Sequence, residues 1–345
     1  MGLGAGPGRR PGRRGGFRRL ARSRWARIGA VLVVLAAGLF GWWASEPSGV
    51  AYPRGVVGLA TGTADGVYDE YGRMLRPWVE HSIPGVRVRL DPTAGSLENL
   101  RRVSDGRDDF AIATVDAVAQ FQASDPEAAG RLRGIARLYD DYVQLVVPAG
   151  SPVRSAADLR GRQVGVGQAG SGVALIAGRV LREAGLVPGR DLTAVPIGIH
   201  DAPTALVDGR LDAFFWSGGL PTGAVTALAR RAEVRLVPLG GLVAGLNRLA
   251  GTGSPYRSST IPAGIYAGTA GARPVATAAV ANVLVTRADV ASGLVERFTG
   301  AVIASRDAIG KVVHPAQLVD LRTAIYTDPL VLAAGARRYY VSTKP

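Results

Sequence analysis

The sequence predicts an α/β fold with mostly parallel sheets, arranged in two lobes, for residues 50–345. Short apolar runs alternate there with segments of helical periodicity, which is typical of strands joined by helices. The length of 345 residues and the hydrophobic content of 47% suffice for a two-lobed core. The Pro-containing segment 148–152 and the Gly-, Ser- and Thr-rich segment 240–273 are the expected crossings between the lobes.

Each expected element follows from its local pattern. The strands are apolar runs between turn residues, at 55–61, 86–90, 109–114, 132–138, 142–148, 162–166, 192–197, 212–216, 234–238 and 275–286. The helices have apolar residues at helical spacing, at 66–81, 96–104, 116–123, 155–160, 171–184, 201–208, 221–231, 292–309 and 315–325. The helix at 171–184 has the clearest limits, because it follows Gly170-Ser171 and stops at Gly185.

The basic charge of the chain belongs to its N-terminal tail. The net charge is +14, and residues 1–27 contain nine Arg and no acidic residue. Subtracting these nine charges from +14 leaves +5 for the other residues, whose basic side chains are scattered and not interleaved with aromatics. We therefore expect a basic, disordered cytoplasmic tail at 1–27 and no nucleic-acid partner.

A membrane anchor is expected directly after this tail. Residues 28–44 carry no charge and would span about 26 Å as a helix, with Trp residues at both ends. Arg residues before the run and Glu46 after it predict that the N-terminus is inside and the folded part outside the cytoplasmic membrane. A cleaved secretory signal and a buried core helix are the alternatives.

The residue content excludes several kinds of site. The chain has no Cys, and His81, His200 and His314 are too far apart for a metal-binding motif, so no metal and no cofactor are expected. The G-x-G-x-x-G pattern at 165–170 lacks the acidic residue that a dinucleotide site needs after the next strand, because Asp191 precedes that strand. No G-x-S-x-G, S-x-x-K or P-loop motif occurs.

Three strand-to-helix turns rich in Gly and hydroxyl residues are the candidate binding elements: 61–68, 93–96 and 165–172. Backbone N–H groups at such helix starts can bind a small anion such as a carboxylate. The alternative is that these glycines only permit tight turns. One acidic pair and one single acid are given structural interpretations: Asp108-Asp109 as solvated residues at a strand start, and Asp201 as a helix N-cap.

The order of these and other motifs resembles the TAXI family of solute receptors, which serve tripartite ATP-independent (TRAP) transporters. The resemblance extends from about Val57 to Ser305. Eight strings carry it: Thr61–Tyr68 (TGTADGVY), Thr93–Asn99 (TAGSLEN), Gly106–Asp116 (GRDDFAIATVD), Asp158–Gly161 (DLRG), Gly167–Gly172 (GQAGSG), Asp208–Phe215 (DGRLDAFF), Gly219–Thr222 (GLPT) and Ile261–Gly264 (IPAG) with Tyr266.

This resemblance implies a two-lobed periplasmic-binding-protein fold of type II, with a ligand cleft between the lobes, preceded here by the transmembrane helix. The first lobe would begin at 50–148, the second lobe would be 149–250, and 251–345 would return to the first lobe. The implied function is a non-enzymatic extracytoplasmic receptor that binds a small organic acid or amino acid, such as glutamate or 2-oxoglutarate. It would deliver this solute to a separate multi-span permease; a membrane-anchored ligand sensor with the same fold is the alternative.

The resemblance also places a ligand site on matching positions of both lobes. The sequence departs from the family pattern at Asp65, Asp69-Glu70, Ala94 and Val173. An extra carboxylate near the cleft would repel an acidic ligand, so either the ligand carries an amine or Asp65 points outward. The implied ligand-binding residues are Gly62, Thr63, Tyr68, Thr93, Gly95, Ser96, Thr114, Asp116, Gly170, Ser171, Gly172, Trp216, Gly218 and Gly219.

Overall fold

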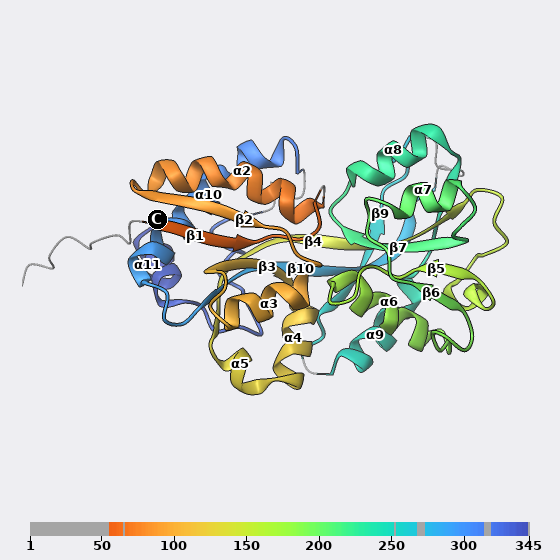
Figure 1. Ribbon diagram of the computed structural model, residues 1–345, viewed down its shortest axis with the longest axis horizontal. Helices are drawn as coiled ribbons and strands as arrows, with labels where there is room; N and C mark the ends of the chain where they lie inside the picture. Colours follow the sequence, from red (N-terminus) through yellow and green to blue (C-terminus); the bar gives the residue numbers. More distant parts are fainter. Residues whose placement is uncertain (1–54, 65, 252, 268–272, 314–318, 344–345) are drawn as a thin grey trace, which may run out of the picture. The chain divides into compact units, whose positions relative to one another are not determined.

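The computed structural model describes residues 55–343 except 65, 252, 268–272 and 314–318 (Figure 1). The predicted tail and anchor, at 1–44, lie outside the described residues, and so do Asp65 and His314. Within the described part, none of the helices is both long enough and apolar enough to cross a membrane.

The described strands form one mixed, ten-stranded sheet in the order β2-β1-β3-β10-β4-β7-β5-β6, with β8 paired to β4 and β9 to β10. Strands followed by helices pair in parallel, β1 with β2 and β3, and β5 with β6 and β7. The bounds are β1 Gly55–Ala60, β2 Val86–Asp91, β3 Phe110–Thr114, β4 Leu132–Pro148, β5 Gln163–Gly165, β6 Thr193–Val195, β7 Ala213–Gly218, β8 Val234–Val237, β9 Tyr256–Ile261 and β10 Val275–Arg287.

The helices cover both faces of this sheet and group into two lobes (Figure 1). Around β1, β2 and β3, α2 and α10 lie on one face, and α3 and α4 lie on the other; α6 to α9 surround β5, β6 and β7. The bounds are α2 Val67–Ser82, α3 Ser96–Ser104, α4 Val115–Ser124, α5 Pro126–Gly130, η1 Ala156–Leu159, α6 Gly172–Glu183, α7 Ala202–Val207, α8 Gly223–Arg231, η2 Gly240–Leu242, α9 Val243–Ala250, α10 Ser292–Gly310 and α11 Ala334–Ser342.

Two apolar clusters hold the layers together. One lies between the first-lobe strands and α2 and α10, where the rings of Phe110 and Phe298 stack with their centroids 4.0 Å apart. The other runs from α3 and α4 through the central strands into the second lobe, with Leu145, Phe214 and Ile176 among its buried members. Because this second cluster continues through both lobes, burial of apolar surface couples them.

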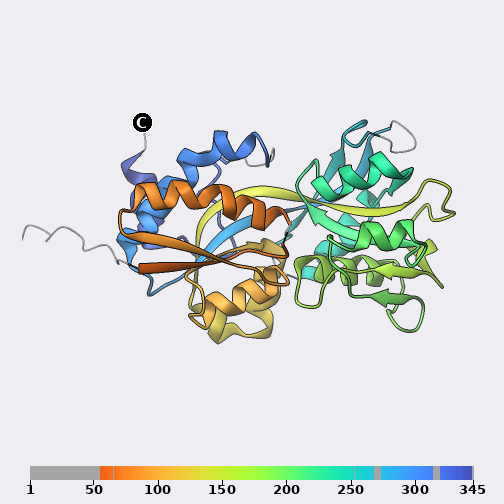
Figure 2. The same ribbon diagram turned by 45° about the horizontal axis from the view of Figure 1, so that its top comes forward.

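The long strands β4 and β10 belong to both lobes, and Figure 2 shows them passing from one to the other. Up to Tyr142, β4 pairs with β10, and from Tyr142 onward it pairs with β7. The register of β4 and β10 shifts between Ala281 and Val283, which is an irregularity at Asn282. Such irregularities redirect a side chain, and this one lies beside the point where β4 changes partners.

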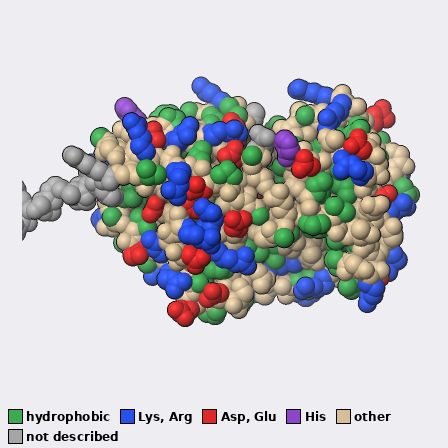
Figure 3. Space-filling model, in the orientation of Figure 1, with side chains coloured by type: hydrophobic (Ala, Val, Ile, Leu, Met, Phe, Trp, Pro, Cys, Tyr) green, Lys and Arg blue, Asp and Glu red, His purple; other side chains and the backbone are tan. Residues whose placement is uncertain are grey.

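Charges of both signs are mixed on the face drawn in Figure 3. Arg89 and Arg102 of the first lobe bind Asp91 and Asp108, with 2.6 Å between Arg102 Nε and Asp108 Oδ2. Asp108 is buried, so its interpretation as a solvated residue is wrong. It is an ion-pair partner, and burial is the main cause that raises the pKa of its carboxyl group.

Several elements differ from the sequence-based expectation. The two strands expected at 132–138 and 142–148 are one strand, β4, which passes between the lobes before the crossing expected at 148–152. Residues 319–325 of the helix expected at 315–325 form turns, held by Asp320, whose carboxylate accepts backbone N–H bonds from Arg322 and Thr323. Such local bonds compete with a helix. Strand β9 and helices α5, α9 and α11 were missed, being five to nine residues long.

Candidate functional site

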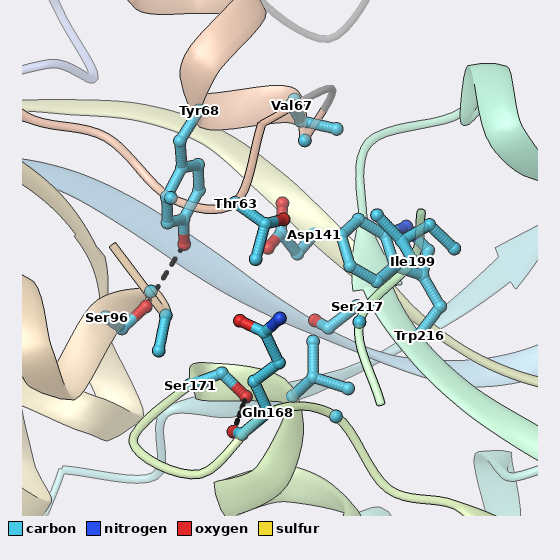
Figure 4. Close-up of a pocket in the computed structure, with 18 of the residues that line it drawn as sticks. Thr63, Val67, Tyr68, Ser96, Asp141, Gln168, Ser171, Ile199, Trp216 and Ser217 are labelled. Carbon is cyan, nitrogen blue, oxygen red and sulfur yellow. Dashed lines mark hydrogen bonds between the residues drawn. The ribbon is translucent and has the colours of Figure 1, made fainter. Parts of the chain in front are cut away.

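A cavity lies where the two lobes meet, beside the changeover in β4 (Figure 4). It encloses about 620 Å³ of space free of protein atoms, its open mouth included. Its lining comes from both lobes: Gly62, Thr63, Gly66, Val67, Tyr68, Ala94, Gly95, Ser96, Thr114, Asp141, Gly167, Gln168, Ser171, Gly172, Val173, Ile197, Gly198, Ile199, Phe215, Trp216 and Ser217.

Asp141 of β4 is the buried carboxylate of this cavity. Its side chain accepts a hydrogen bond from Asn282 Nδ2 at 2.7 Å, and only 3% of the residue is exposed. Desolvation, together with the charges of Asp140 and Asp116, raises the pKa of Asp141 to about 7, although the bond from Asn282 opposes this. A carboxyl group with this pKa changes its charge in the physiological range.

The hydroxyl groups of Tyr68 and Ser96 connect Asn282, the hydrogen-bond partner of Asp141, to the first-lobe turns. Tyr68 Oη donates to Asn282 Oδ1 at 2.5 Å and lies 3.3 Å from Ser96 Oγ. Ser96 Oγ in turn accepts the backbone N–H of Thr114 at 3.2 Å. Burial is the main cause that raises the pKa of Tyr68, so its hydroxyl stays protonated and remains a donor.

Apolar side chains form the second-lobe wall: Val173, Ile197, Ile199, Phe215 and Trp216. The Trp216 indole is fixed by a hydrogen bond from its Nε1 to Thr222 Oγ1 at 3.1 Å. A Cβ at Gly218 would come within 2.5 Å of that nitrogen, so Gly218 leaves room for the indole. The wall therefore has a fixed aromatic plane against which an apolar group can pack.

One polar group at the cavity has no hydrogen-bond partner in the described part of the chain. The Ser217 hydroxyl is buried and has no hydrogen-bond partner among the described residues. Figure 4 shows it and the Gln168 amide directed to the same open space. A buried unpartnered hydroxyl costs free energy unless a ligand or water satisfies it, so these groups are suited to orient a ligand.

The two lobes contact each other beside the cavity. The backbone N–H groups of Leu97 and Glu98, at the start of α3, donate to Gly170 O across the junction at 3.2 and 3.3 Å. A Cβ at Gly172 would lie 3.0 Å from Ser96 Oγ, and glycine at this position permits the close approach. The lobes are therefore closed over the cavity.

A buried ion pair lies behind this contact. Asp116 of α4 accepts from Arg179 Nη1 of α6 at 3.2 Å and from the hydroxyl of Tyr256 at 2.5 Å. Arg179 also donates to Tyr256 at 2.7 Å and to Gln120 at 3.2 Å. Arg179 and Asp116 are both almost completely buried, so separating the lobes would break a pair shielded from water.

Nine of the fourteen expected ligand-binding residues line the cavity, and five do not. The nine are Gly62, Thr63, Tyr68, Gly95, Ser96, Thr114, Ser171, Gly172 and Trp216. The other five have structural roles in the described part of the chain, namely Thr93 (bonded to Asn99), Asp116 (paired with Arg179), Gly170 (bonded to α3), Gly218 (packed below Trp216) and Gly219 (bonded to Thr222).

Sequence reasoning missed Asp141, Gln168, Ser217 and the apolar wall except for Trp216. Asp140-Asp141 falls between the strands expected at 132–138 and 142–148, and two acids so close to apolar runs were the available signal. Asp69 and Glu70 both bind Arg73 and are not in the cavity lining. Asp201 occupies the N-cap position of α7 without a side-chain capping bond.

Residues 59–342, which are most of the chain, match the model of the NMT1-like family. The chain belongs to this family.

Solved structures resemble this NMT1-like chain in fold. One is described as a periplasmic transporter, with 14% identity, a TM-score of 0.52, and coverage of 85% of this chain and 93% of that chain. A protein from Bordetella bronchiseptica RB50 has 19% identity, a TM-score of 0.50, and coverage of 84% and 90%. The alkanesulfonate-binding protein from Xanthomonas axonopodis pv. citri has 16% identity, a TM-score of 0.46, and coverage of 85% of each chain. The family match and the fold of the first of these structures show a periplasmic-binding-protein-like fold.

The first prediction concerns the cost of ionising Asp141. Its pKa falls from about 7 in the folded chain to about 3.8 in the unfolded chain, so stability is lost as pH rises between these values. We expect Asp141→Asn to remove this loss, which is about 4 kcal/mol at about 1.36 kcal/mol per pKa unit. Urea unfolding of both proteins at pH 4 and pH 8 measures it, and a difference that does not change with pH would contradict the assignment.

The second prediction concerns the buried pair. Arg179→Met leaves Asp116 buried without its cation, and we expect the free energy of unfolding to fall by about 3–5 kcal/mol. The double variant Asp116→Leu/Arg179→Met removes both charges and should recover most of this loss. Urea unfolding gives the comparison, and equal losses in the single and double variants would show that the ion pair is not the cause.

Proposed function

We propose that this protein is a solute receptor whose lobes close over one small organic molecule. The observation that carries this is the cavity at the lobe junction, which contains a carboxylate and an unpartnered hydroxyl, Asp141 and Ser217, opposite a fixed aromatic wall. Few convergent polar groups in a mostly apolar cavity are typical of small-molecule binding sites. The candidate binding residues are the nine expected residues that line the cavity, with Asp141, Gln168 and Ser217 added.

Closure by rigid lobes supports the same proposal. Only β4 and β10 among the described strands are long enough to serve both lobes, and their changeover lies at Asp141. Hinge movement at these strands would separate Leu97 and Glu98 from Gly170 and would open the cavity. A ligand that contacts both lobes binds the closed form better and therefore shifts the population toward it.

The finer assignment follows the TAXI resemblance. In this proposal the protein has the type II version of the fold, is not an enzyme, and delivers its solute to a separate multi-span TRAP-type permease. The folded part is outside the cytoplasmic membrane, held by the apolar segment 28–44. Of the two ligand classes that the resemblance implies, the lining favours an amino acid over a simple organic acid, because its charged side chain is the carboxylate of Asp141.

Thermal unfolding of the full-length chain tests the receptor proposal. A panel of amino acids, amines, dicarboxylates, keto acids and sugars is added, and a ligand of the folded state should stabilise it by about 2.7 kcal/mol at a hundredfold excess over its Kd. Ala94→Trp fills the cavity and should abolish the response, whereas Ala123→Trp, at an exposed position of α4, should keep it. A folded protein that responds to no compound would contradict the proposal.

A further inference from the structure

We infer that the cavity takes a solute with an ammonium group and an apolar body, and that Asp141 is the counter-ion of the ammonium. This inference rests on the proposed receptor function and names the chemical class of its ligand. Of the two ligand classes that the TAXI resemblance implies, it is compatible with an amino acid and not with an organic acid that lacks an amine. It depends on which charged side chains line the cavity, on the contacts of Asp141 and on the apolar wall across the cavity from it.

The described lining of the cavity contains an acidic side chain and no basic one. Among the described residues that line it, Asp141 is the only charged side chain, and none is Lys, Arg or His. A binding site for a carboxylate normally provides a cation, most often an Arg that binds both oxygens. Here the ionised Asp141 carboxylate would attract a positive ligand group and repel a negative one.

The basic side chains near Asp141 already have other partners. Its neighbour Asp140 binds Arg137 at 2.9 Å and also binds Arg257, on the other side of β4. Asp116 holds Arg179 at 3.2 Å. No ion pair reaches Asp141 from the described part of the chain, where Asn282 is its hydrogen-bond partner.

The described groups that act on Asp141 include no cation. They are Asp140 and Tyr139 of β4, Asp116 of α4, Tyr68 of α2 and the amide of Asn282. The charges of Asp140 and Asp116 make the ionised carboxylate costly, whereas the Asn282 amide favours it. Desolvation is the main cause that raises the pKa of Asp141 to about 7. A bound ammonium would lower this pKa again, because an opposite charge favours the carboxylate.

The apolar wall across the cavity from Asp141 determines the chemical character of the rest of the ligand. Figure 4 shows Asp141 beside Thr63, with Ser217, Trp216 and Ile199 across the open space. An ammonium at Asp141 can donate further hydrogen bonds to hydroxyl oxygens such as those of Thr63 and Ser217. Its carbon chain would then lie along the apolar wall. An amino acid with an apolar side chain, or the corresponding primary amine, has this distribution of groups.

Two series of three related compounds separate the possibilities. Isothermal titration of the full-length chain compares leucine, 3-methylbutylamine and 4-methylpentanoate, and then phenylalanine, 2-phenylethylamine and 3-phenylpropanoate. We expect binding of the compounds that carry the amine and at least about tenfold weaker binding of the acids that lack it. The affinity of the amines should rise about tenfold per pH unit up to about pH 7 and then level off, because only the ionised Asp141 binds them.

Two matched variants assign the effect to one carboxylate. Asp141→Asn keeps the shape and the bond to Asn282 and should weaken amine binding about ten- to a hundredfold, with loss of the pH dependence below pH 7. Asp307→Asn makes the same change at an exposed residue of α10, which does not line the cavity, and should leave binding within about threefold. Circular dichroism confirms that both variants are folded.

The outcomes distinguish this inference from the proposed function. If the acids bind as tightly as the amines, if affinity falls as pH rises, or if Asp141→Asn binds amines like the wild type, the ammonium inference is wrong while the receptor function stands. If the folded chain binds none of the six compounds but does bind a sugar or keto acid, the same conclusion holds. If it binds nothing in the wider panel, both are overturned.

Discussion

The site depends on one constraint, the burial of the Asp141 carboxylate where β4 leaves one lobe for the other. Successive side chains of a strand point to opposite faces, so Asp140 faces the arginines outside while Asp141 faces the cavity. The irregularity at Asn282 in β10 allows an amide to reach Asp141, and Tyr68 then binds that amide. The first-lobe turns are thereby linked to the two strands that join the lobes.

The helix that follows the glycine-rich turn at 93–96 uses two of its N–H groups within the protein. The three turns are predicted to present helix N–H groups to an anion, and at this one the N–H groups of Leu97 and Glu98 bind Gly170 O of the opposite lobe. The alternative left open, that glycine permits close turns, explains Gly95, whose φ of +129° is unfavourable for other residues. The turns are at the cavity, but part of their hydrogen-bonding capacity is used in closing the lobes.

The sequence was sufficient for what is encoded locally. The alternation of apolar runs and amphipathic segments predicted β1, β3 and α6 to within about two residues, because each has its own pattern and turn residues. Asp116 looked like a cleft residue because it follows a strand, but its partners Arg179 and Tyr256 are distant in sequence. Asp141 was missed for the same reason, since only the fold brings it to Trp216. Single-sequence patterns carry no record of such long-range pairing.

The two buried carboxylates near the junction explain how recognition can be coupled to closure. Asp116 is neutralised within the protein by Arg179 and Tyr256, so its burial does not depend on a ligand. Among the described residues, Asp141 has the Asn282 amide as its side-chain partner and no cation, so closing the empty lobes places an uncompensated charge in a medium of low polarity. A ligand ammonium removes this cost only in the closed form, where both lobes surround it. The differential affinity that a receptor needs would then arise from one unpaired carboxylate, while the Asp116 pair stabilises the closed contact once it has formed.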